Sequence, residues 1–568
     1  MSNKIYPQVY KNLEDWPIHK LHQDRKAFVQ EITEFTVSQL SKGTTDDISE
    51  MIGKTAYLEQ IRIKEEPWKV DPPKEKSFWK KVQKKLVKKA LDQKEQQAKA
   101  ANKEILTSIV NRYAEEIVAT FRISTYQFAR KFLTFFFGRL LNTAASKNIK
   151  RLVGGKHRLQ ERMQISGHIE TVRSLMKKGT VVILPTHHSN LDSVLIGYIM
   201  DIFGGLPHFS FAAGLNLYNT GYTAYFINRL GAYRLDRRKK NPIYLETLKA
   251  MSNLAIQRGT NCIIFPGGTR SRSGHLEKKL KMGMLGTTVA AQAAKAERGE
   301  DHKIFIVPVI VGYHFVLEAP FLIEQYLRKT GKERYINVKD SSYSFRKVLR
   351  FAWNYFSNGS KILLTFGQPL DVLGNNVNAE GQSFDQYGNK IDVQDYFKRD
   401  GIVKRDNQRE MEYTRILANR VVERFFADNV VLSSHAIAFT VFNILKAQNV
   451  HLDLYGILRL PSEDYEFPID LVIDAMSKLQ NALVELNKNG LAGLSEEMYL
   501  PSKELVHNGL KSLGVFHAQK PLKLNSKGNI ISESFKLLYF YHNRLDHYSL
   551  DKKINWSAYK IEEELVEV

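Results

Sequence analysis

The chain has 568 residues, of which 43% are hydrophobic and 25% charged, a composition typical of a folded protein with sizeable cores. A single cysteine excludes an intramolecular disulfide and argues against a thiolate metal site. The net charge of +23 predicts attraction to polyanions such as nucleic acid, anionic lipid or an acidic carrier, without choosing among them.

Residues 1–150 are expected to form a mainly helical, basic region that can contact a membrane surface. Segment 74–94 carries an apolar stripe with Phe78 and Val82 among many lysines, so it can lie on an anionic bilayer or pack on its own domain. Segment 122–142 is more apolar and favours a shallow membrane anchor over a core helix. We expect no signal peptide and no clear transmembrane span.

Residues 151–375 have a different hydrophobic pattern, in which short apolar runs alternate with helical segments. The runs are 180–185, 261–268, 304–313 and 361–367, and the clearest helical segment is 241–257. This alternation predicts an α/β catalytic domain with a mostly parallel central sheet flanked by helices. Residues 376–410 are rich in glycine and asparagine and are predicted to be a linker or loop. Helical patterns return in residues 411–568 and predict a C-terminal helical domain.

A possible acid–base pair lies where a strand becomes a helix. The strand ends at Pro185, and Asp192 falls in the first turn of a helix that Ser189 or Asn190 can cap. Across such a turn His187 can face Asp192, and a carboxylate that holds one imidazole nitrogen leaves the other free as a general base. The pair alone is a weak signal, and the neighbouring histidine at position 188 is the alternative base.

An anion cradle follows about eighty residues later. A Pro-Gly-Gly turn ends at Gly268, and Arg270 and Arg272 alternate with small hydroxyl residues. Glycine backbone and paired guanidinium groups together suit a phosphate or carboxylate. The segment lacks the Gly-Lys-Ser/Thr ending of a nucleotide P-loop, so we do not predict ATP binding. Arg237 and Lys281 can add charge to the same pocket.

The order of these elements, closed by an apolar strand that contains Pro308, resembles the glycerolipid acyltransferase family. That family has a His-x4-Asp motif, a Gly-aromatic-Arg block, a Phe-Pro-Glu-Gly-Thr-Arg-Ser block and an apolar block with proline. The resemblance implies that His187 is the base and Asp192 its partner. It implies substrate-binding roles for Arg237, Gly268, Arg270, Ser271, Arg272, Lys281 and Pro308.

The sequence departs from the family at two positions. Gly267 stands where the third block usually has glutamate, as also in the plastid branch of the family, and Asp236 stands where an arginine is common. Segments 432–439 and 537–548 are similar to the C-terminal region of the large bacterial and mitochondrial glycerol-3-phosphate acyltransferases. We expect His435 and His542 in these segments to be capped or core residues.

The resemblance implies acyl transfer from acyl-CoA or acyl carrier protein to the sn-1 hydroxyl of glycerol-3-phosphate, without a cofactor or metal. It implies a peripheral or monotopic protein on the cytoplasmic face of an anionic membrane, with no nucleic-acid partner. The alternatives are another acceptor, such as lysophosphatidic acid or dihydroxyacetone phosphate, and a basic nucleic-acid or membrane-binding protein without activity. In the two-domain CoA-dependent acyltransferases His188 would be the base, but Ser193 stands where they need glycine.

Overall fold

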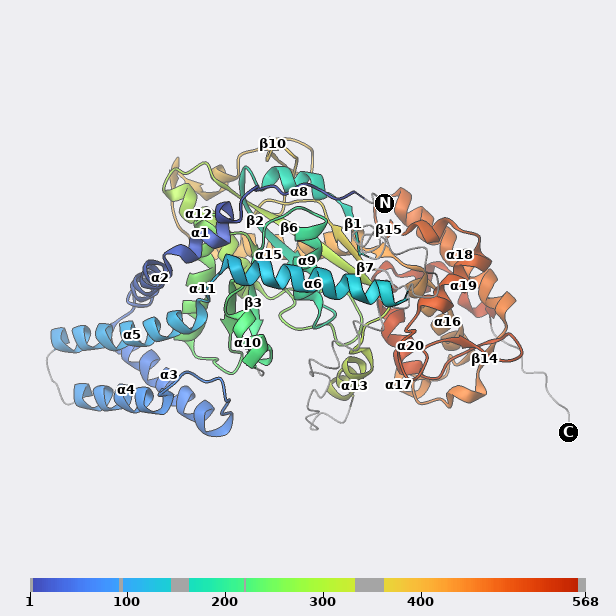
Figure 1. The fold of residues 1–568 in the computed structure, drawn as a ribbon, viewed down its shortest axis with the longest axis horizontal. Helices are drawn as coiled ribbons and strands as arrows, with labels where there is room; N and C mark the ends of the chain where they lie inside the picture. Colours follow the sequence, from blue (N-terminus) through green and yellow to red (C-terminus); the bar gives the residue numbers. More distant parts are fainter. Residues whose placement is uncertain (1–3, 91–94, 145–162, 219–220, 332–361, 560–568) are drawn as a thin grey trace.

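The computed structural model describes residues 4–90, 95–144, 163–218, 221–331 and 362–559. Within them, seven strands form a central sheet in the order β1-β7-β6-β2-β5-β3-β4. Figure 1 shows this sheet between the N-terminal helices, in blue, and the C-terminal helices, in orange and red. Neighbouring strands are parallel except β6 and β7. This confirms the predicted mostly parallel sheet. The strands are β1 (Met163–Gly167), β2 (Gly179–Pro185), β3 (Ser210–Gly214), β4 (Ala232–Leu235), β5 (Cys262–Ile263), β6 (Lys303–Tyr313) and β7 (Ile362–Phe366).

Both faces of the sheet are covered, as a parallel sheet requires. Along β2, Val181 and Ile183 enter the core on one face, while Val182 and Leu184 enter the core on the other. The covering helices are α8 (Ile169–Leu175), α9 (Asp192–Ile202), α10 (Gly221–Ile227), α11 (Pro242–Gln257), α12 (Met282–Glu297) and α13 (Ala319–Thr330). The β2-α9 connection therefore delivers the His-Asp segment to the carboxyl edge of the sheet, where ligands of open α/β sheets bind.

The N-terminal helices pack against α11 and share a core with it. They are α1 (Pro17–Gln23), α2 (Arg25–Leu40), α3 (Thr45–Glu65), α4 (Glu75–Ala90), α5 (Glu95–Ile117) and α6 (Ile123–Ala144). In α4, Trp79 and Val82 are buried, with only 1% and 4% of their surface exposed. Of the two alternatives for segment 74–94, the structure therefore shows the one in which its apolar stripe packs on its own domain.

Residues 376–410, predicted to be a linker or loop, form an ordered set of short hairpins joined by turns. Its strands are β8 (Asn376–Val377), β9 (Ser383–Phe384), β10 (Lys390–Ile391), β11 (Lys398–Arg399) and β12 (Ile402–Val403). Val393 and Phe397 are buried in the core beneath α12 and α15 (Asn407–Ala427). The linker prediction was wrong because a glycine-rich and asparagine-rich composition also suits tight hairpin turns anchored by a few buried apolar side chains.

The C-terminal region is helical, as predicted, but it shares one core with the sheet. Helix α16 (Ser433–Gln448) is buried almost throughout, and α18 (Ile469–Lys488), α19 (Ser502–Ser512) and α20 (Phe535–His542) pack around it. The smaller elements are α17 (Leu454–Ile457), α21 (Leu550–Lys553), β13 (Val430–Val431), β14 (Glu466–Phe467), β15 (Gly493–Leu494), β16 (Lys523–Leu524) and β17 (Ile530–Ile531). Among the helices of the described residues, none is both long and apolar enough to cross a bilayer.

Candidate active site

His187 and Asp192 face each other across the β2-α9 turn. The distance from His187 Nδ1 to Asp192 Oδ2 is 2.7 Å, and the carboxylate is fully buried. Asp192 Oδ2 also accepts hydrogen bonds from the backbone N–H groups of His188 and Ser189. Asp192 therefore orders its own turn. The helix begins at Asp192 with Leu191 at its N-cap, so the prediction that Ser189 or Asn190 caps it was wrong. Asp192 Oδ1 accepts a further bond of 2.7 Å from the hydroxyl of Tyr313.

The structure separates the two histidines. The ring of His187 lines a cavity, whereas His188 is buried with 3% of its surface exposed, and its Nε2 accepts a hydrogen bond from Arg544. Burial, and then the charge of Arg544, hold the pKa of His188 well below its usual range. Because Asp192 occupies Nδ1 of His187, Nε2 of that ring is the nitrogen left to act on a bound substrate.

The cavity has a volume of about 730 Å³, and it is basic at one end. Arg237, Arg270, Arg272 and Lys281 line that end. Burial, followed by repulsion from Arg270 and Arg272, lowers the pKa of Arg237. A cluster of guanidinium and ammonium groups of this kind suits a multiply charged anion.

The anion cradle is joined to the histidine turn by its backbone. Ser271 N–H donates to His187 O at 2.7 Å, and Arg237 Nη2 donates to Gly268 O at 2.6 Å. Gly268 has a φ of +73°, and a Cβ there would lie 2.8 Å from Cδ of Lys281. Only glycine therefore lets this backbone turn so close to Lys281.

Two of the predicted binding residues do not reach the cavity that the described residues form. The Ser271 hydroxyl donates to His275 O, so it holds the loop together. Pro308 is buried within the continuous strand β6, in register with Leu184 of β2, and its carbonyl accepts from Gly367 N–H. These are corrections, since the motif marks positions in the chain but does not show which side chains point toward the cavity.

Seven apolar side chains also line the cavity and are together termed the apolar arm. They are Ala212, Leu215, Leu217, Tyr233, Leu235, Leu245 and Leu248, from β3, β4 and α11 and the segment between β3 and α10. Of these residues, Tyr233 and Leu235 belong to the predicted block that ends at Arg237. Sequence reasoning missed this arm, because its residues come from three separated elements and look like ordinary core positions.

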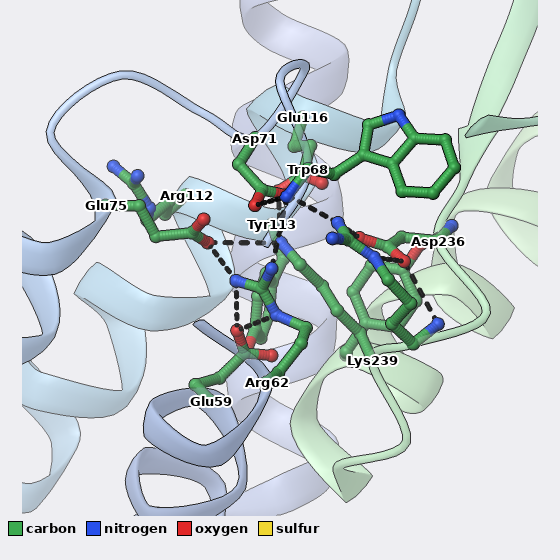
Figure 2. A network of polar contacts seen from close by, with 12 residues as sticks. Glu59, Arg62, Trp68, Asp71, Glu75, Arg112, Tyr113, Glu116, Asp236 and Lys239 are labelled. Atoms are coloured by element: carbon green, nitrogen blue, oxygen red, sulfur yellow. Dashed lines mark hydrogen bonds and ion pairs between the residues drawn. The ribbon is translucent and has the colours of Figure 1, made fainter. Parts of the chain in front are cut away.

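A buried polar network of the N-terminal helices holds the segment that carries Arg237 (Figure 2). Lys239, whose side chain is completely buried, donates to Glu116 Oε2 at 2.6 Å. Arg238 bonds Asp236 and Asp71, and Asn241 donates to Glu59 at 2.8 Å. The N-terminal region is thus built into the site, and its Trp68 also lines the cavity.

A buried glutamate joins the histidine turn to the cradle from the other side. Glu318 accepts hydrogen bonds from Ser189 Oγ and Asn190 N–H, at 3.0 and 2.9 Å, and it lies 3.4 Å from Arg270 Nη1. Burial raises the pKa of Glu318, and the charge of Arg270 opposes that rise. No motif in the sequence marked this residue.

The C-terminal region also supports the site. Arg544 donates to Val311 O at 2.9 Å as well as to His188, and Asn543 donates to Ser273 O at 2.8 Å. His435 and His542 are buried, as expected for core residues; the second stacks on Phe439.

Cys262 is excluded as a nucleophile of the site. Burial raises the pKa of the Cys262 thiol to about 12, so this residue of β5 stays protonated in the core. Among the described residues, no group of three or more histidine, cysteine, aspartate or glutamate side chains is arranged to hold a metal ion.

An α/β sheet with a His-Asp pair and an arginine cradle at its carboxyl edge defines a domain suited to acyl transfer. Comparison with known proteins agrees, since residues 152–312 match the family model described as Acyltransferase. The matched part includes the histidine turn and the arginine cradle, so the part of the chain that carries them is similar to acyltransferases.

Curated relatives from several bacteria bear the name glycerol-3-phosphate acyltransferase. The one from Aeromonas hydrophila is 31% identical over 41% of this chain and 26% of its own length. Those from Alteromonas mediterranea and Shewanella frigidimarina are 27% and 26% identical over 48% and 65% of this chain, and over 30% and 40% of their own lengths. The chain thus matches less than half the length of each relative.

One solved structure, the 1-acyl-sn-glycerophosphate (LPA) acyltransferase PlsC from Thermotoga maritima, aligns with 67% of this chain and 97% of that one. The identity is 12% and the TM-score 0.24, which is too low to carry a structural argument.

Proposed function

We propose that this protein transfers a fatty acyl group from acyl-CoA or acyl carrier protein to the sn-1 hydroxyl of glycerol-3-phosphate, giving lysophosphatidic acid. One observation carries the proposal: a single cavity contains His187, which Asp192 holds, and the basic side chains Arg237, Arg270 and Lys281. The names of the curated relatives support the same acceptor.

In this proposal His187 acts as the general base. Its Nε2 takes the proton of the acceptor hydroxyl while the oxygen attacks the carbonyl carbon of the thioester. The new C–O bond forms, the C–S bond breaks, and the imidazolium returns the proton to the leaving thiolate. Asp192 holds the imidazole in the required tautomer and stabilises the imidazolium. The protein needs no side-chain nucleophile for these steps.

The basic end of the cavity would bind the phosphate of the acceptor. Arg270 and Arg272, with Arg237 and Lys281, can neutralise a phosphate dianion and fix the hydroxyl beside His187. Such positioning lowers the activation free energy by several kcal/mol, because the reacting groups are already held in the required geometry. In the best intramolecular systems this effect reaches about 7–11 kcal/mol. The apolar arm offers a place for the acyl chain of the donor.

We also propose that the protein attaches peripherally to an anionic membrane. Helix α6 exposes Phe128, Phe132 and Phe135, and α10 beside it exposes Tyr222 and Tyr225. Phe128 stacks on Phe226 of α10, so the two helices form one aromatic surface. Aromatic side chains at such a surface suit the interface of a bilayer, and the net charge of +23 suits anionic lipid.

The test is an assay of purified full-length protein with labelled glycerol-3-phosphate and either palmitoyl-CoA or palmitoyl-acyl carrier protein. The expected product is 1-acyl-glycerol-3-phosphate, identified by the position of its acyl group. Lysophosphatidic acid and dihydroxyacetone phosphate are offered as competing acceptors. A clear preference for either of them, or binding of nucleic acid without any acyl transfer, would overturn the proposal.

A further inference from the structure

The third motif block lacks its usual carboxylate, since Gly267 stands where the family has glutamate. We propose that Glu277, ten residues later, returns this carboxylate to the same place and positions His187. The inference rests on the proposed function only for its kinetic readout, because the geometry stands by itself.

The first observation is spatial coincidence. A Cβ added to Gly267 would lie 3.0 Å from Cγ of Glu277 and 3.3 Å from its Oε1. The backbone of Gly267 is not in the left-handed region, so it can accept a side chain there without left-handed strain. The added Cβ would also lie 3.5 Å from the carbonyl oxygen of Thr269, an ordinary contact, so its close neighbour is the Glu277 side chain. The Glu277 carboxyl group thus occupies the space into which a side chain at position 267 would grow.

The second observation is the bond that Glu277 makes. Its Oε1 accepts a hydrogen bond of 3.0 Å from the backbone N–H of His187. Asp192 holds the ring of the same histidine, and Ser271 N–H holds its carbonyl. Glu277 therefore holds the backbone N–H of His187, while Ser271 holds its carbonyl and Asp192 holds its ring.

The third observation concerns charge. Part of the Glu277 side chain is exposed, but Oε2 is shielded from solvent and has no hydrogen-bond partner among the described residues. Burial raises the pKa of Glu277, and the N–H of His187 and the charge of Arg544 oppose this rise. Glu277 therefore bonds the histidine turn and also interacts with the charge of Arg544, a residue of the C-terminal region.

The experiment relocates the carboxylate. We compare the wild type with Glu277→Ala, Gly267→Glu and the double variant, measuring kcat, KM for glycerol-3-phosphate and the melting temperature. Glu277→Ala is expected to lower kcat about 10-fold to 100-fold with little change in KM, because a misplaced base slows chemistry more than binding. The double variant is expected to recover most of that loss. Glu297→Ala, on the exposed end of α12, is the control and should behave as wild type.

A crystal structure of the double variant gives a readout independent of activity. The introduced carboxylate is expected within hydrogen-bond distance of His187 N–H. If Glu277→Ala does not fold, recovery of folding and activity in the double variant supports the inference equally. It is overturned if a folded Glu277→Ala keeps its kcat, or if the double variant leaves His187 N–H without the carboxylate. A wild type that does not acylate glycerol-3-phosphate overturns the proposed function, whereas the crystal structure still decides the role of Glu277.

Discussion

Tyr313 donates a hydrogen bond of 2.7 Å to Asp192, although 121 residues separate them in the chain. Tyr313 ends strand β6, and Asp192 begins α9. Both are buried, and the bond goes to the carboxylate oxygen that His187 does not use. Tyr313 thus fixes the orientation of the carboxylate that in turn orients the histidine.

Replacing Tyr313 by phenylalanine removes this bond and keeps the ring. We expect kcat to fall about 5-fold to 30-fold. A hydrogen bond to a charged group contributes about 1.5–3 kcal/mol, and part of this reaches the transition state through the orientation of the Asp192 carboxylate. KM for glycerol-3-phosphate should stay the same. Tyr455→Phe, whose hydroxyl bonds Thr330 at the surface, is the matched control. An unchanged kcat would remove Tyr313 from the catalytic arrangement.

The two adjacent histidines should give opposite results on substitution. His187→Ala is expected to lower kcat about 100-fold to 10,000-fold, the usual contribution of a general base, while the melting temperature changes little. His188→Ala leaves the buried Nη1 of Arg544 without the acceptor that His188 provides, so it should cost about 1–3 kcal/mol of folding free energy. Kinetics and thermal unfolding of both variants check this, and a His187→Ala enzyme of normal activity would contradict the assignment.

The network in Figure 2 predicts a stability effect at Lys239. Lys239→Met removes the cation that lies 2.6 Å from the buried carboxylate of Glu116. Glu116 then keeps the longer contact to Arg234 at 3.9 Å, while Glu75 keeps its closer partner Arg62 at 2.6 Å. Breaking a buried pair in this way costs about 3–5 kcal/mol. Chemical denaturation measures the effect, with Lys249→Met as the control because that lysine forms an exposed pair. Equal stability of the two variants would show that the network contributes little.

The apolar arm predicts a way to change chain-length preference. Gly214 lines the cavity at the end of β3, and a Cβ there would meet nothing within 4 Å. Gly214→Leu should therefore fold normally and shorten the preferred acyl chain, because its side chain fills part of the arm. The measurement is the rate of acyl transfer from donors with chains of eight to eighteen carbons. Gly53→Leu, at a distant helix position with equal space, is the control and should leave the profile of rate against chain length unchanged. An unchanged profile would place the acyl chain elsewhere.

The aromatic surface of α6 and α10 predicts a loss of lipid binding. Changing Phe128, Phe132 and Phe135 together to serine should weaken binding to anionic vesicles about 10-fold or more, since each buried aromatic side chain contributes at least about 1 kcal/mol. Flotation with anionic and neutral vesicles measures it. Tyr387→Ser, on an exposed hairpin, is the control. Vesicle binding unaffected by the triple change would show that this surface does not contact lipid.

The sequence alone determined the architecture around the motifs. Apolar runs of strand length between helical segments require a sheet covered on both faces, so β2, β6 and β7 lie where their patterns predict them. Local turn chemistry also brought His187 to Asp192 and placed the arginine cradle after β5. These features depend on residues close together in the chain, and such residues leave a pattern.

Only the tertiary structure decided what surrounds the motifs. An amphipathic stripe looks the same whether it meets lipid or protein, so the burial of Trp79 could not be read from its spacing. Tyr313, Glu277 and Arg544 bond to the histidine turn, and these bonds join residues that lie 90 to 356 positions apart in the chain. Contacts between such distant residues depend on how the elements pack, and packing leaves no local signal in the sequence.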